Sequence, residues 1–146
     1  STIHTNSAWA TISRLIDMGV PSFLIASTLN ISVAQRLVRK LCDKCKKEVP
    51  IDLSLFPESF LPPKNLTSHF RAVGCNNCHH TGYIGRKAIY EILPISTALQ
   101  LPIKNNQLEI NDYLKEKKID TLKSNAIQLI KDGTTSIEEV YALLTD

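Results

Sequence analysis

Four cysteines form two matched pairs, and their spacing constrains the fold of this 146-residue chain more than any other feature. The pairs are Cys42/Cys45 and Cys75/Cys78, with 29 residues between them. Two residues between cysteines allow both thiolates of a pair to face one cation, and two pairs supply the four soft ligands of a tetrahedral site. The spacing therefore predicts a structural Zn²⁺ on these four residues, with iron in a four-sulfur site as an alternative.

The same four cysteines could instead form disulfides or a redox-active pair. Two disulfides would also consume an even number, but the N-terminal segment has no signal-peptide pattern. A thioredoxin-like redox pair needs only one Cys-x-x-Cys and leaves the second pair without a role. Disulfides, iron and free thiols remain alternatives to zinc. His79 and His80 follow the last cysteine, and because four thiolates already complete a tetrahedron, we expect both histidines beside the ligands or in solvent.

The charge of the chain is modest but uneven. Its formal charge is +3, yet residues 1–47 carry seven Lys and Arg against two acids, while the remaining 99 residues carry ten against twelve. The excess gathers beside the first cysteine pair, in Arg36, Arg39, Lys40, Lys44, Lys46 and Lys47. Such a cluster can contact phosphate, although lysines solvated around thiolates are the simpler explanation. No apolar run approaches the length of a membrane-spanning helix.

The first 30 residues predict two helices. Apolar residues recur at helical spacing from about Ser7, and Gly19 is placed to end this helix. Pro21 suits the first turn of a second helix, which we expect to end near Asn30.

The next elements surround the cysteines. Periodicity fits residues 31–41 equally well to a helix and to one face of a strand. Residues 87–93 are rich in β-branched and aromatic residues and precede Pro94, which predicts a strand. If residues 31–41 are its antiparallel partner, the cysteines lie on the enlarged tip of a β-hairpin. The proline-rich segment between the pairs is expected to be irregular, so that a metal would give it shape.

The C-terminal third predicts three short helices that form a small bundle. Apolar stripes begin at Leu108 and at Leu122, and Gly133 is placed just past the end of the second stripe. Ser136 and Glu139 form an S-x-x-E capping box ahead of the third helix.

Several strings, in this order, resemble the C-terminal part of the type II secretion and type IV pilus assembly ATPases. The strings are residues 3–6, 13–20, 23–27 and 34–39 with the first cysteine pair, then 74–78, 81–83, 85–86, 89–91 and 133–140. The resemblance covers nearly the whole chain and is weakest in the proline-rich loop and over residues 95–118.

The resemblance implies a hexameric cytoplasmic motor with a RecA-like core that binds ATP and Mg²⁺. It also implies neighbouring subunits and an inner-membrane platform protein as partners, so that membrane association occurs through partners only. His4 matches the histidine box of the family, which lies near the terminal phosphate. No G-x-x-x-x-G-K-[ST] occurs here, so we expect no catalytic residue and no ATP hydrolysis by this chain itself.

These observations predict a mainly helical α+β chain in four parts. Residues 1–41 would end a RecA-like ATPase core, 42–84 would form the tetracysteine zinc module, 85–94 the return strand and 95–146 the helical bundle. The expected function is that of a motor region whose structural zinc supports contacts with subunits or the platform protein. The alternative is a stand-alone zinc ribbon that binds nucleic acid through residues 36–47, although few aromatic residues are interleaved there for base stacking.

Overall fold

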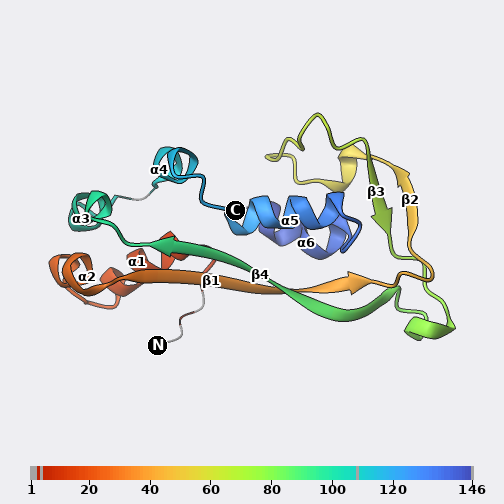
Figure 1. Ribbon diagram of the computed structural model, residues 1–146, viewed down its shortest axis with the longest axis horizontal. Helices are drawn as coiled ribbons and strands as arrows, with labels where there is room; N and C mark the ends of the chain where they lie inside the picture. The colour runs from red at the N-terminus through yellow and green to blue at the C-terminus, as the bar shows by residue number, and fades with distance from the viewer. Residues whose placement is uncertain (1–2, 4, 108, 146) are drawn as a thin grey trace. The chain divides into compact units, whose positions relative to one another are not determined.

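The computed structural model describes residues 3, 5–107 and 109–145, and within them helices and strands combine in an α+β fold (Figure 1). The α+β prediction is thereby confirmed. The chain divides into two compact units. The first unit comprises Ser1–Gln35 and Tyr90–Leu122, and the second comprises Arg36–Ile89 and Lys123–Asp146.

The two longest strands, β1 (Ile31–Leu41) and β4 (Tyr83–Pro94), pair with each other and carry the chain through both units. At one end the amide of Ile95 donates to the carbonyl of Asn30, and at the other the amide of Cys42 donates to the carbonyl of Gly82, each at 2.9 Å. The start of β1 therefore lies beside the end of β4, and the end of β1 lies beside the start of β4, so the two strands are antiparallel. The ambiguity over residues 31–41 is resolved in favour of a strand.

The burial pattern of β1 alternates with the two-residue period of a strand near its start, and the alternation breaks at its end, where Lys40 is exposed and Leu41 is buried. Ser32, Ala34 and Val38 are buried, whereas Ile31 and Leu37 are 52% and 57% exposed. Apolar side chains occupy both buried and exposed positions of the strand, so apolar periodicity alone could not identify its packed side.

The first unit holds the helices α1 (Ala8–Asp17), α2 (Ser22–Thr28), α3 (Thr97–Lys104) and α4 (Asn111–Glu116). Ser7 caps α1 by accepting a hydrogen bond from the amide of Ala10 at 3.0 Å. Gly19, with φ +89°, ends it through the paired bonds of a Schellman motif. The predicted start and end of the first helix are confirmed, whereas Pro21 is the N-cap of the second helix rather than part of its first turn.

The core of the first unit combines small and branched apolar side chains with the ring of Trp9. They come from α1, α2, α3, β1, β4 and the start of α4, as follows: Ala8, Trp9, Ile12, Ile25, Ala26, Ala34, Leu93, Leu99, Ile103 and Ile110. Helix α3 was not predicted, because Pro102 interrupts its sequence pattern. Leu99 and Ile103 nonetheless are almost fully buried at helical spacing, and this packing supports the helix.

The second unit holds a small antiparallel sheet of β2 (Lys47–Pro50) and β3 (Ser68–Arg71), the 3₁₀ turns η1 (Leu53–Leu55) and η2 (Asn76–Cys78), and helices α5 (Leu122–Lys131) and α6 (Ile137–Thr145). The segment between the cysteine pairs is therefore more ordered than its prolines suggested. Phe56 and Leu66 are buried and anchor this segment.

The C-terminal helices are divided between the two units. Residues 97–122, with α3 and α4, belong to the first unit, and α6 with nearly all of α5 belongs to the second. The capping residue of α6 is confirmed, because Ser136 Oγ accepts from the amide of Glu139 at 3.4 Å. The carboxylate of Glu139 is bonded to Arg39, a partner that local sequence could not indicate.

Candidate metal centre

The four cysteines come from two tight turns. Cys42 follows the last residue of β1, and its carbonyl accepts from the amides of Cys45 and Lys46 at 3.1 and 2.9 Å. The carbonyl of Cys75 likewise accepts from the amide of Cys78 at 3.1 Å. Each two-residue spacing thus closes one turn and places both thiols of a pair on the same side. We call the residues of these turns, 42–46 and 75–82, the cysteine knuckle.

Three of the sulfur–sulfur separations match the edge of a zinc–thiolate tetrahedron. Sγ of Cys42 is 3.9 Å from that of Cys75, and Sγ of Cys78 is 3.8 Å from those of Cys45 and Cys75. All four ligand atoms lie within 4.8 Å of one another. A Zn–S distance of about 2.3 Å gives a tetrahedron with edges of about 3.8 Å, whereas a disulfide needs about 2.05 Å. The residues present therefore fit a metal better than a pair of disulfides.

Backbone amides favour the ionised form of one thiol. The amides of Cys75 and Gly82 both donate to Sγ of Cys78 at 3.2 Å. Burial raises the pKa of Cys78, but these hydrogen bonds outweigh it and bring the pKa to about 6. Burial beside the other thiols raises the pKa of Cys45 to about 11. A divalent cation bound by the four sulfur atoms would favour the thiolate form of these residues.

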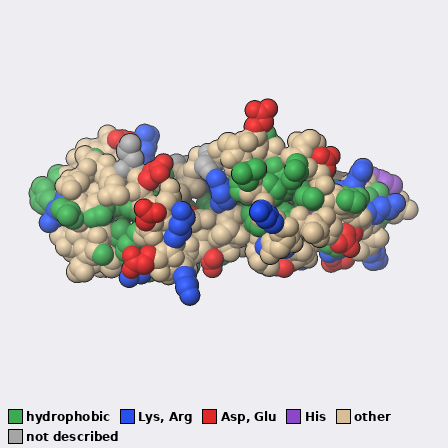
Figure 2. Space-filling view, turned by 90° about the horizontal axis from the view of Figure 1, so that it is seen from above, with side chains coloured by type: hydrophobic (Ala, Val, Ile, Leu, Met, Phe, Trp, Pro, Cys, Tyr) green, Lys and Arg blue, Asp and Glu red, His purple; other side chains and the backbone are tan. Residues whose placement is uncertain are grey.

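The neighbouring histidines are placed differently from the cysteines. His79 and His80 are exposed, with φ of +49° and +60°, and histidine side chains appear at the surface in Figure 2. Within the described part of the chain, the group of side chains that could hold a metal consists of the four cysteines. His4 lies outside the described residues.

The basic stretch beside the knuckle is partly engaged within the second unit. The guanidinium of Arg39 lies 2.6 Å from the carboxylate of Glu139 and 4.2 Å from the ring centre of Tyr83. Lys46 Nζ lies 2.7 Å from the carboxylate of Asp43. Figure 2 shows Lys and Arg side chains interspersed with Asp and Glu on the face in view. Two of the six basic side chains in this stretch are thus held by contacts within the protein, whereas nucleic-acid binding needs cations that can reach a phosphate backbone.

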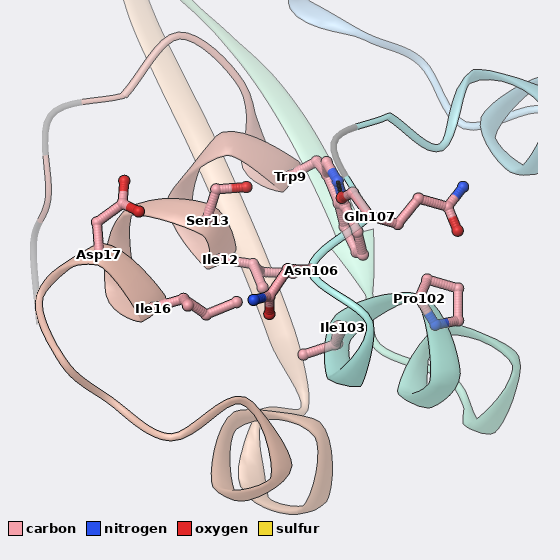
Figure 3. Close-up of a pocket in the computed structure, with 9 residues that line it drawn as sticks. All are labelled: Trp9, Ile12, Ser13, Ile16, Asp17, Pro102, Ile103, Asn106 and Gln107. Carbon is pink, nitrogen blue, oxygen red and sulfur yellow. Dashed lines mark hydrogen bonds between the residues drawn. The ribbon is translucent and has the colours of Figure 1, made fainter.

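A hollow lies in the first unit, between α1 and the end of α3 (Figure 3). Its volume is about 90 Å³, and its lining combines Trp9, Ile12 and Ile103 with polar groups at the rim. Trp9 is fixed there by a 2.9 Å hydrogen bond from its Nε1 to the carbonyl of Gln107. The hollow is too small to enclose a nucleotide, and we assign no chemistry to it.

Sequence reasoning missed the structural roles of two residues, one in each unit. Glu91 is buried on β4, and Lys46 reaches from the knuckle to the carbonyl of Gly133. An acid within the apolar run of residues 88–93 was a usable signal for Glu91. No signal marked Lys46, because five other basic residues lie in the same stretch.

Fold and site together define an α+β protein with a tetracysteine cluster suited to a metal ion. A family model described as "Type II/IV secretion system protein" matches residues 1–142. The chain belongs to this family.

Curated relatives agree with the family. Over its whole length the chain is 41% identical to the type IV pilus assembly ATPase PilB of Pseudomonas aeruginosa, of which it covers 26%. It is 40% identical to the type II secretion system ATPase E of Vibrio cholerae and 38% identical to the putative type II secretion system protein E of Escherichia coli. Each of these matches covers 96% of this chain, and 28% and 29% of those proteins. The chain thus spans about a quarter of the length of these relatives.

Among the described residues, no helix has the length and apolar character needed to cross a bilayer.

Proposed function

We propose that this chain is the metal-binding and C-terminal helical region of a secretion or pilus assembly motor ATPase, with a structural Zn²⁺ on Cys42, Cys45, Cys75 and Cys78. The sulfur separations of 3.8–3.9 Å carry this proposal, because they match the edges of a zinc–thiolate tetrahedron. When bound, zinc would supply no redox chemistry. The cysteines would hold the end of β1 beside the start of β4, where Cys42 and Gly82 already share a hydrogen bond.

Family membership supports a wider role in this proposal. In this proposal residues 1–41 end a RecA-like core, 42–84 form the zinc module, 85–94 return to the core and 95–146 complete the helical region. The motor would be a cytoplasmic homohexamer that contacts an inner-membrane platform protein. ATP and Mg²⁺ would bind in a longer protein, because residues 1–146 contain no P-loop sequence. His4 would face the terminal phosphate there.

Metal analysis tests the site. We expect the chain, purified under reducing conditions, to carry about one zinc per molecule by mass spectrometry and to be colourless, whereas iron bound by thiolates absorbs visible light. Cys78→Ser should lose most of the metal, and the control Asn76→Ala, an exposed position in the same turn, should retain it. A wild-type chain without bound metal would refute the zinc proposal.

Exchange of matching segments tests the motor role. The corresponding quarter of the Pseudomonas pilus ATPase and of the Vibrio secretion ATPase can each be replaced by this chain. We expect at least one chimera to support assembly in a cell that lacks its own ATPase, assayed as surface pili or as secreted protein. The chimera that works identifies the type of machine. Failure of both folded, metal-loaded chimeras would argue against the motor role.

A further inference from the structure

The α5–α6 turn (residues 133–136) lies against the strands and turns that carry the cysteines. The amide of Leu41, the residue before Cys42, donates to the carbonyl of Thr134 at 2.8 Å. Thr135 is fully buried, and its Oγ1 donates to the carbonyl of Arg39 at 2.8 Å. The turn is therefore hydrogen-bonded to the end of β1, directly before the first cysteine pair.

Lys46 provides a direct connection from the cysteine knuckle. It immediately follows Cys45, and its Nζ donates to the carbonyl of Gly133 at 3.0 Å. The same ammonium lies 2.7 Å from Asp43 and 5.3 Å from the ring centre of Phe70, and its side chain is only 23% exposed. A partly buried ammonium with this fixed set of partners stabilises one position of the turn relative to the knuckle.

The backbone conformation of the turn and its close contact with Phe70 require a glycine at position 133. Gly133 has φ +62°, and a Cβ atom built there would lie 2.6 Å from Cδ2 of Phe70 on β3. Only a glycine allows both the backbone conformation and the contact. On the other side, the hydroxyls of Ser136 and Tyr83 share a hydrogen bond of 2.8 Å. Residues after both cysteine pairs thus contact one turn.

We infer that metal binding at the knuckle controls the order of the α5–α6 turn and the start of α6, with Lys46 as the connecting residue. This inference rests on the proposed zinc site. Without a metal, the thiols of Cys42 and Cys45 lose the constraint that fixes their turn, and Lys46 is released with that turn. The start of α6 then loses contacts that its own short sequence cannot replace.

Hydrogen exchange measured by NMR tests the inference on four samples: the zinc-loaded chain, its metal-stripped reduced form, and the zinc-loaded variants Lys46→Met and Lys44→Met. Lys46→Met retains the aliphatic stem and leaves all four cysteines in place. Lys44 is exposed within the same turn, so Lys44→Met is the matched control. The reporters are the amides of Leu41 and Glu139, and the reference is the amide of Leu29 in the first unit.

We expect Lys46→Met to accelerate exchange at both reporters by about tenfold or more, since a hydrogen bond from a charged donor is lost. Stripping the metal should accelerate exchange further. Lys44→Met should leave the reporters unchanged, and the Leu29 reference should stay constant throughout. Equal exchange in the loaded and stripped forms, or equal effects of the two lysine variants, would overturn the inference. A chain that binds no metal refutes the zinc proposal as well, whereas bound metal with unchanged exchange refutes this inference alone.

Discussion

Glu91 shows how one side chain can position two helices. It is only 3% exposed on β4, and both its carboxylate oxygens accept backbone hydrogen bonds. Oε1 accepts from the amide of Ala8 at 2.7 Å and Oε2 from the amide of Leu122 at 3.1 Å. These are the first residues of α1 and α5, so the negative charge lies at two helix N-termini, where the helix dipoles favour it.

Glu91→Gln tests this double cap with almost no change in shape. The amide keeps one acceptor oxygen and replaces the other with a donor, so one buried N–H group loses its partner. We expect the free energy of unfolding in urea to fall by about 1–3 kcal/mol. Glu58→Gln, at an exposed position, should have almost no effect. Equal midpoints for the two variants would show that the cap contributes little.

The ion pair of Glu139 and Arg39 makes stability depend on pH. Partial burial raises the pKa of Glu139, but hydrogen bonds from the side chain and amide of Arg39 outweigh burial, so the pKa lies below its ordinary value of 4.5. The unfolded state therefore binds this proton more readily than the native state. The pair stabilises the fold above about pH 4.5, and this contribution is lost as the pH falls through the native pKa.

Glu139→Gln should therefore flatten the acid side of the stability curve. We expect a loss of about 1 kcal/mol at neutral pH, because Arg39 is half exposed, and a smaller difference from wild type in acid. Urea midpoints measured across the acid range check this expectation. Glu138→Gln, on the exposed side of the same helical turn, is the control. Parallel curves for wild type and Glu139→Gln would contradict the assignment.

At the scale of elements, comparing alanine substitutions at two glycines distinguishes the cost of backbone strain from the cost of a steric clash. Gly133 and Gly85 have similar φ values of +62° and +71°, but only Gly133 has a neighbour that a Cβ would meet, the ring of Phe70. Each change to alanine should cost about 1–2 kcal/mol from backbone strain. Gly133→Ala should cost more in urea unfolding, and Phe70→Leu should recover part of the excess. Equal costs would mean that the ring moves aside freely.

At the scale of the whole molecule, unfolding of the two units can be followed by different spectroscopic signals. Trp9, the only tryptophan in the sequence, belongs to the first unit, and all four cysteines belong to the second. Because a structural metal contributes to folding through its own ligands, we expect chelation under reducing conditions to affect the second unit most. The urea midpoint followed by Trp9 fluorescence should shift less than the midpoint followed by the amides of α6. Equal shifts would show that both units unfold as one.

The sequence alone determined features that depend on residues close together in the chain. The two Cys-x-x-Cys turns, the terminating glycines Gly19 and Gly133 and the cap of α6 by Ser136 are each defined within a few positions. Family membership was also accessible, because it rests on strings of residues in order. Such signals are local, and the backbone can satisfy them before distant segments meet.

Only the tertiary structure decided which long-range partners complete these elements. Residues 31–41 became a strand because β4 pairs with them, and α3 formed despite Pro102 because Leu99 and Ile103 are buried. Glu91 meets Ala8 across 83 positions, and Glu139 meets Arg39 across 100. No periodicity encodes such pairs, because burial and hydrogen-bond geometry arise only when the chain has folded.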